Sequence, residues 1–363
     1  MKLPRFKLPF GIDWSLYIVP LILSIFGIAV IYSITYGTNN HLAFDQIVYV
    51  ILGIGAAIGL TIVDYRTLKG LYLILYLIGI GLLILVLFIG TTTFGATRWI
   101  NLIVFQLQPS EIFKIIILIV LAKFFSDWQE FNWKKILLVL VMVLIPVALI
   151  LKQPDLGTAS TIFIGLLAIM LLSPMRKIYL IIGLAVIIAF SPVGWHFLKT
   201  YQKNRIRTFV NPSADPQGAG YNVNQAKIAV GSGGLWGQGL GKGSQSQLNF
   251  LPVAHTDFIF AGTAEATGFA GSLFLIVLLG YLIIRIFIIA RLAKDNFGMY
   301  LAIGIGTIFL FQTLINIGMN LGIMPVTGIP LPFVSYGGSS TLTNLAAIGI
   351  LQSIYIRHRK IVF

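Results

Sequence analysis

The feature that most limits how this chain can fold is a series of long apolar runs joined by short polar links. About ten runs have the roughly 17 to 25 residues that a helix needs to cross ~30 Å of hydrocarbon. Hydrophobic residues make up 58% of the 363 positions and charged residues only 10%, which leaves too little polar surface for a water-soluble fold. The sequence therefore predicts an all-α, polytopic membrane helix bundle with about ten transmembrane helices. These lie near residues 14–36, 43–63, 70–90, 110–126, 134–151, 156–173, 177–195, 257–290, 298–322 and 337–356.

The distribution of basic residues sets the expected orientation of the bundle. Most of the 25 Lys and Arg residues flank the apolar runs, and placing both termini in the cytoplasm puts the majority on the cytoplasmic side. An odd number of spans would remove this bias. The net charge of +14 is then explained by membrane topology rather than by a basic face for nucleic acid, so we expect no nucleic-acid partner. The chain has no cysteine, which excludes disulfides and thiolate chemistry.

We interpret residues 1–363 as a single transmembrane domain with one large extracytoplasmic loop at about 196–256. Loops of this length in compact proteins are usually functional or disordered. Its glycine-rich stretch at 231–244 does not fit a nucleotide-binding P-loop, because Trp236 replaces the first glycine and Gly243 replaces the final Ser or Thr. The backbone amides of a flexible outer loop can still approach a phosphate.

Charged residues at membrane depth are functional candidates because each is costly unless it is paired or hydrated. Glu111 and Lys114, in QPSEIFK, are three residues apart and can face the same side of one helix, either as a local ion pair or as part of a site. Asp155, in QPDLGT, stands where a helix begins, so it either caps that helix or pairs with Lys114. We expect the three to form one polar cluster near the outer membrane boundary.

Asp257, in HTDFIF, places a carboxylate where the long outer loop meets an apolar helix. It is either the N-cap of that helix or a functional group facing the outside. Glu265 lies about two turns deeper on the same side, where it can tune Asp257 or bind a neighbouring helix. His255 has no Cys, His or acidic cluster around it, so we expect no metal site built from protein ligands alone.

The run NIGMNLGIMPVTGIPLPFVSYGGSS at 316–340, which includes Ser335, resembles the signature of the SEDS family, whose members include RodA, FtsW and SpoVE. Further similarities extend from about residue 95 to 340, and GSQSQLNFLPVAHTDFIFA is more similar to the RodA branch of cell elongation than to the FtsW branch of division. Ala266 stands where the family usually has a second acidic residue, which weakens a paired role for Glu265. The other matching segments are GATRWI, QLQPSEIFK, QPDLGT, RIRTFVNPSADPQGAGYN, IAVGSGGLWGQG and HTDFIF.

The resemblance implies a peptidoglycan glycosyltransferase that polymerises lipid II during cell elongation, by an inverting single displacement. It places Asp257 as the general base for the acceptor 4-hydroxyl. Mg²⁺ or Mn²⁺ bound with the substrate pyrophosphate can share in neutralising its charge. The candidates for binding the pyrophosphates are Arg98, Lys114, Arg205 and Arg207. The supporting polar residues are Glu111, Asp155, His255, Glu265 and Ser335.

The same resemblance implies the location and the partners. We expect a multi-pass protein of the bacterial cytoplasmic (inner) membrane that binds lipid II and the growing lipid-linked glycan strand. A class B penicillin-binding protein and other membrane proteins of the elongation complex are the expected protein partners. Two other classes remain open: a lipid II flippase or transporter, and a scaffold that recruits wall enzymes. Polymerisation by detergent-solubilised protein separates an enzyme from a flippase, and a scaffold would tolerate the loss of Asp257.

The ten-span topology can be tested by labelling single cysteines introduced into this cysteine-free chain. A cysteine placed within 211–220 should react with an impermeant reagent added outside the cell, whereas one placed just after Lys177 should react only from the cytoplasm. Labelling of 211–220 only from the cytoplasmic side would contradict the topology.

Overall fold

Helices form most of the computed structural model, as the apolar runs predict. The structure describes residues 11–36, 41–93, 96–101, 106–128, 130–183, 185, 189, 196, 200–210, 219–248, 250–251 and 253–358. The helices are α1 (Ser15–Thr35), α2 (His41–Ile62), α3 (Tyr65–Gly70), α4 (Tyr72–Ile89), α5 (Pro109–Asp127), α6 (Trp133–Lys152), α7 (Leu156–Leu172), α9 (Thr200–Val210), α10 (Ala219–Ser232), α11 (Ser244–Gln247), α12 (Ile259–Leu292), α13 (Asn296–Asn320) and α14 (Gly338–Ile356).

Every predicted run except 177–195 coincides with one of these helices. Residues 178–183 of that run are helical, and most of its remainder lies outside the described residues. Within the part of the chain that is described, six helices are long and apolar enough to cross a membrane. They are α1, α2, α4, α6, α12 and α13, and α7 is a shorter apolar helix of 17 residues. The chain is thus a polytopic helical membrane protein.

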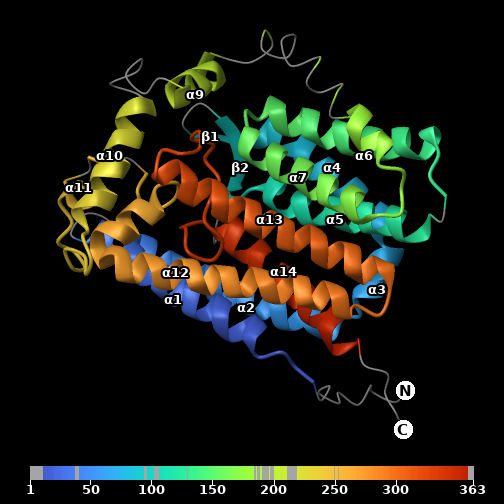
Figure 1. Ribbon diagram of the computed structural model, residues 1–363, viewed down its shortest axis with the longest axis horizontal. Coiled ribbons are helices and arrows are strands. Elements are labelled where there is room, and N and C mark those ends of the chain that lie inside the picture. Colours follow the sequence, from blue (N-terminus) through green and yellow to red (C-terminus); the bar gives the residue numbers. More distant parts are fainter. Residues whose placement is uncertain are drawn as a thin grey trace.

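The central helices of the bundle are α13 and α14. Figure 1 shows α1, α2 and α12 on one side of them and α4 to α7 on the other, and α13 packs against α12, α7 and α5 while α14 packs along α2. The burial of the helices agrees with this arrangement. In α13 the most apolar stretch is 72% buried inside the protein, whereas in α4 it is 22% buried. The exposed apolar faces of outer helices such as α4 are therefore suited to lipid.

Glycine permits the close contact between α2 and α14. A Cβ atom on Gly349 of α14 would lie 2.3 Å from the carbonyl oxygen of Ala57 on α2. One turn lower in number on each helix, Gly53 of α2 lies against Leu345 of α14. The small residues of the 51–61 helix therefore serve close helix packing.

A small sheet, which the sequence analysis did not predict, follows α4. It consists of β1 (Thr91–Thr93), β2 (Ala96–Asn101) and β3 (Gln106–Leu107), paired antiparallel in the order β1-β2-β3. In Figure 1 this sheet lies at the same end of the molecule as α9 and α10, whereas α3 and the C-terminal end of α14 lie at the opposite end.

Much of the 196–256 segment that the structure describes is helical, which its composition did not predict. It contains α9, α10 and α11, and its turn at 234–239 is hydrogen-bonded to a break in α12. The break is at Gly268, whose φ of 69° and ψ of −163° interrupt the helix. The amides of Phe269 and Ala270 donate to the carbonyls of Gly234 and Leu235, at 2.9 and 3.1 Å. The backbone groups that the break releases are thus satisfied by the turn.

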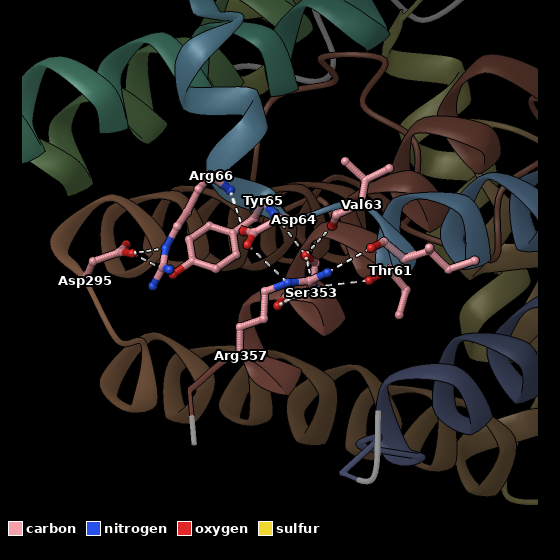
Figure 2. Close-up of polar contacts among 9 residues, drawn as sticks. Thr61, Val63, Asp64, Tyr65, Arg66, Asp295, Ser353 and Arg357 are labelled. Carbon is pink, nitrogen blue, oxygen red and sulfur yellow. Dashed lines mark hydrogen bonds and ion pairs between the residues drawn. The ribbon is translucent and has the colours of Figure 1, made fainter. Parts of the chain in front are cut away.

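Arg357 joins the ends of α2 and α14 at the α3 end of the molecule. Figure 2 shows its guanidinium pointing at the C-terminal end of α2, where it donates to the carbonyls of Thr61 at 3.3 Å and Ile62 at 2.8 Å. It also donates to Ser353 Oγ at 2.7 Å and lies 3.4 Å from Asp64 Oδ2. Arg357 therefore satisfies carbonyls that have no partner within α2 and complements the helix dipole.

Asp295 fixes the turn between α12 and α13 beside this network. Its Oδ2 accepts hydrogen bonds from Tyr65 Oη at 2.7 Å and Arg66 Nε at 2.9 Å, as Figure 2 shows. Its Oδ1 accepts from the amide of Gly298 at 2.8 Å, which caps α13. Burial raises the pKa of Asp295, but the hydrogen bonds from Gly298, Tyr65 and Arg66 outweigh it and hold the pKa below its usual value.

We predict that Arg357→Ala lowers the stability of the solubilised protein by about 1 to 2 kcal/mol, because two C-terminal carbonyls of α2 lose a charged donor. The measurement is the apparent Tm in detergent. Arg176→Ala, which changes an exposed arginine in the connection after α7, is the matched control and should leave the Tm near that of the parent. An equal Tm for the parent and Arg357→Ala would show that this network contributes nothing to stability.

Candidate active site

A cavity of about 600 Å³ opens among segments that are far apart in the sequence. Its walls come from β2 and β3, the first turns of α5 and α7, helices α9, α10 and α13, the turn at 253–258, and residues 326–330 and 336–340. Among the residues predicted for the site, it is lined by Arg98, Glu111, Asp155, Arg205, His255 and Asp257.

Asp257 lies on the cavity wall in the turn before α12. A Cβ atom on Gly328 would be 3.4 Å from Asp257 Oδ2 and 3.9 Å from Arg205 Nη1, so the carboxylate and the guanidinium both lie beside this glycine. The N-cap residue of α12 is Phe258, and no side chain caps the helix. The alternative interpretation of Asp257 as an N-cap is therefore wrong. Burial raises the pKa of Asp257, and the positive charges of Arg205 and Arg98 offset this only in part.

Two asparagines of α13 hold the backbone at Asp257. Asn316 and Asn320 are each fully buried, and the Nδ2 atom of each donates to the carbonyl oxygen of Asp257 at 3.1 Å. Neither asparagine is among the predicted site residues. Their spacing of four residues places two amides on one face of an apolar helix. Because buried polar groups in a membrane helix need partners, this spacing could have marked both residues as part of a polar site.

Ser335 also holds this turn. Its hydroxyl donates to the carbonyl of Thr256 at 2.8 Å and accepts from the amide of Leu331 at 2.8 Å. Next to it, the amide of Tyr336 donates to the carbonyl of His255 at 2.9 Å, and the two rings meet edge to face with centroids 5.6 Å apart. Burial lowers the pKa of His255 and raises that of Tyr336, so both side chains are neutral near pH 7.

Arg98 is held on β2 by the connection between α6 and α7. Its Nε donates to the carbonyl of Gln153 at 2.9 Å, its Nη2 donates to the carbonyl of Pro154, and its Nη1 lies 3.9 Å from Asp155 Oδ1. Asp155 in turn accepts from the amide of Thr158 at 3.0 Å, which confirms that it caps α7. These contacts fix a cation at the cavity wall.

Glu111 and Lys114 form a separate buried ion pair on α5. Lys114 Nζ is 2.7 Å from Glu111 Oε2, and the lysine side chain is fully buried. Glu111 lines the cavity, and Lys114 lies behind it. The predicted cluster of three is therefore two adjacent pairs, Glu111 with Lys114 and Asp155 with Arg98.

The remaining two predicted site residues lie away from the cavity wall. Arg207, two positions after Arg205 on α9, has an exposed side chain. Glu265 is fully buried in α12 and accepts hydrogen bonds from the amides of Gln245 at 2.7 Å and Ser246 at 3.1 Å. It therefore holds the first turn of α11 against α12, which matches the prediction that it binds a neighbouring element.

The cavity also holds polar groups that the protein itself does not satisfy. Gln312 Oε1 on α13 and Thr327 Oγ1 are buried without a hydrogen-bond partner, and both residues line the cavity. Combined with two arginines and three carboxylates, they give a wall that can bind an anionic, hydroxyl-rich ligand and remove a proton from it.

Comparison with known proteins identifies the family. Residues 10–360 match the sequence pattern of the FtsW, RodA and SpoVE cell cycle proteins. The chain belongs to this family. It is 39% identical to the peptidoglycan glycosyltransferase MrdB of Escherichia coli (strain K12), over 96% of this chain and 94% of that protein. It is 35% identical to the probable peptidoglycan glycosyltransferase FtsW of Trichlorobacter lovleyi, over 94% of this chain and 92% of that protein.

Solved structures agree with the sequence comparison. A chain from a study of how a peptidoglycan synthase complex coordinates polymerisation and crosslinking superposes with a TM-score of 0.84, at 29% identity, over 96% of this chain and 99% of that one. The rod shape determining protein RodA of Thermus thermophilus superposes with a TM-score of 0.72, also at 29% identity, over 96% and 97% of the two chains. The RodA fold therefore extends over nearly the whole chain.

We predict that Lys114→Met destabilises the solubilised protein by about 3 kcal/mol or more, because it leaves Glu111 charged and unpaired in the interior. Activity should fall together with the apparent Tm. Adding Glu111→Gln to this variant should recover most of the stability, since no charge of this pair then remains buried. Equal Tm values for the single variant and the parent would contradict a structural ion pair at this position.

Proposed function

We propose that this chain is a peptidoglycan glycosyltransferase that polymerises lipid II into glycan strands during cell elongation. The observation that carries the proposal is the carboxylate of Asp257, with its raised pKa, on the wall of a large cavity that Arg98 and Arg205 also line. The names of the relatives, which span almost the full chain, support the same activity.

In the proposed reaction, the acceptor 4-hydroxyl oxygen attacks the anomeric carbon of the donor sugar. The bond from that carbon to the pyrophosphate oxygen breaks, and undecaprenyl pyrophosphate leaves. Asp257 takes the proton of the attacking hydroxyl, and the configuration at the anomeric carbon inverts in this single displacement. A carboxylate with a raised pKa is a stronger base than an ordinary aspartate, while the positive charges of Arg205 and Arg98 limit how far burial raises that pKa.

The pyrophosphate leaves more readily when its charge is neutralised, and we assign this role to Arg98 and Arg205, which line the cavity. Lys114 acts on the site through Glu111, and Arg207 extends the basic surface of α9. An Mg²⁺ or Mn²⁺ ion carried by the pyrophosphate would need only one or two protein carboxylates, and Glu111 and Asp155 line the same wall besides the proposed base. Such an ion would supply further charge neutralisation.

We place the cavity end of the bundle outside the bacterial cytoplasmic membrane and the α3 end, with both termini, in the cytoplasm. The basic residues at the α3 end support this orientation, among them Arg66, Lys69, Lys123 and Arg357. The cavity then faces the side on which cell-wall strands are made.

The partner that we propose is a class B penicillin-binding protein, which would cross-link the strand as it emerges, within a larger elongation complex. The similarity to a chain from a peptidoglycan synthase complex supports this pairing. It also implies that activity is best measured with the partner present.

Asp257→Asn is the direct test of the proposed base. The amide keeps the shape of the side chain but cannot accept a proton at neutral pH, so we expect glycan polymer formation from lipid II to fall by about 10²-fold or more. The assay uses purified protein in detergent with its partner, which also excludes an activity that requires transport across a membrane. Asp127→Asn, a carboxylate paired with Lys69 at the α3 end, is the control. A stably folded Asp257→Asn with parental activity would exclude Asp257 as the base.

A further inference from the structure

Three segments of the site meet at two side-chain amides of α13. Asn316 Nδ2 donates to the carbonyl oxygens of Asp257 at 3.1 Å and Ile329 at 2.8 Å. Asn320 Nδ2 donates to the same carbonyl of Asp257 at 3.1 Å and to the carbonyl of Asn316 at 2.8 Å. Asn320 Oδ1 accepts from the amide of Ala261 at 3.0 Å. The two amides thus connect α13, the start of α12 and the 326–330 segment.

These contacts are selective for a carboxamide. Each Nδ2 has two protons, and each donates to two carbonyl oxygens. The amide of Ala261 lies in the first turn of α12, where amides have no partner within the helix, and Asn320 Oδ1 supplies one. A buried polar group without a partner costs about 1 to 3 kcal/mol. An apolar side chain of the same size would therefore leave several backbone groups unsatisfied.

The contacts of Asn316 also link Asp257 to the neighbouring part of the cavity wall. Gly328 precedes Ile329, whose carbonyl Asn316 holds, and Gly328 lies against both Asp257 Oδ2 and Arg205 Nη1. Gly328 has a φ of 75°, so this part of the wall is already confined to a conformation that favours glycine. One side chain therefore holds the backbone of Asp257 and the neighbouring wall relative to each other.

We infer that Asn316 and Asn320 are positioning residues, which hold the carboxylate of Asp257 at the place and depth that proton transfer requires. This inference rests on the proposed role of Asp257 as the base. It goes beyond that role in assigning part of the rate to two side chains that hold the backbone at Asp257 and bridge it to the neighbouring wall. A misplacement of about 1 Å in a reacting group can cost about 10²-fold in rate.

Loosening these contacts should also change the pH dependence. Burial raises the pKa of Asp257, so a carboxylate that gains access to water should have a pKa closer to the ordinary value for aspartate. The acid limb of the rate profile should therefore move to lower pH. The ionisable groups that line the same cavity are Tyr49, Arg98, Glu111, Asp155, Arg205, His255 and Tyr336, and the substitution leaves all of them in place.

The test compares Asn316→Ala with Asn344→Ala, a matched control in which a buried asparagine is removed from α14. Purified protein with its partner is assayed for polymerisation of lipid II as a function of concentration and pH. For Asn316→Ala we expect kcat to fall about tenfold to hundredfold, KM to stay within about threefold, and the acid limb to move to lower pH. Asn344→Ala should keep kcat within about twofold of the parent.

Asn316→Ser, which keeps one donor, serves if the alanine variant does not fold, and it should lose less activity. Parental kcat and pH profile in a folded Asn316 variant would overturn the inference, as would an equal loss in Asn344→Ala. Failure of both Asn316 variants to fold would assign the residue a purely structural role and overturn it as well. The separate Asp257→Asn assay distinguishes these outcomes from a failure of the proposed function, because an active Asp257→Asn removes the base itself.

Discussion

The structure depends on one constraint, which is that no polar group inside an apolar bundle can rely on bulk water. Among the described residues, three departures from regular helix show how partners within the protein replace water. The break at Gly268 is met by the backbone of the 234–239 turn, and the end of α2 is met by Arg357. The start of α7 is capped by Asp155. These contacts fix neighbouring segments relative to one another. The cavity is lined by several segments that contacts of this kind hold in place.

The same constraint explains why the site is built from many short segments. Backbone that is neither helix nor sheet is tolerated at membrane depth only where protein or a polar cavity surrounds it. The turn at 253–258 and the stretch at 326–337 satisfy this requirement by bonding to each other and to α13. As a result, Asp257 is positioned by residues more than fifty places later in the chain, and the proposed catalytic group cannot be separated from the packing of α13.

The helices could be predicted from the sequence because the length of an apolar run is set by the thickness of a bilayer, and α1, α12 and α13 all fall on predicted runs. The cavity position of Asp257 and the capping by Asp155 were also accessible, since charged residues in apolar surroundings are rare. The small sheet was not, because TTTFGATRWIN does not alternate between apolar and polar residues. The pairing of Asp155 with Arg98 rather than Lys114 depends on where β2 lies against the connection before α7. That is a tertiary relation which local spacing does not contain.

The break at Gly268 divides α12 into two lengths that have separate contacts with the rest of the protein. The first length, residues 259–267, begins two residues after Asp257, and its carbonyls at Glu265 and Ala266 accept hydrogen bonds from the amides of Gln238 and Gly239. The second and longer length starts from Gly268, whose φ of 69° is not helical. Asn320 of α13 accepts from the amide of Ala261, and the 234–239 turn donates to the carbonyls of Glu265 and Ala266, so the first length is anchored at both ends. The position of Asp257 therefore depends on these two anchors rather than on the direction of the longer length of α12.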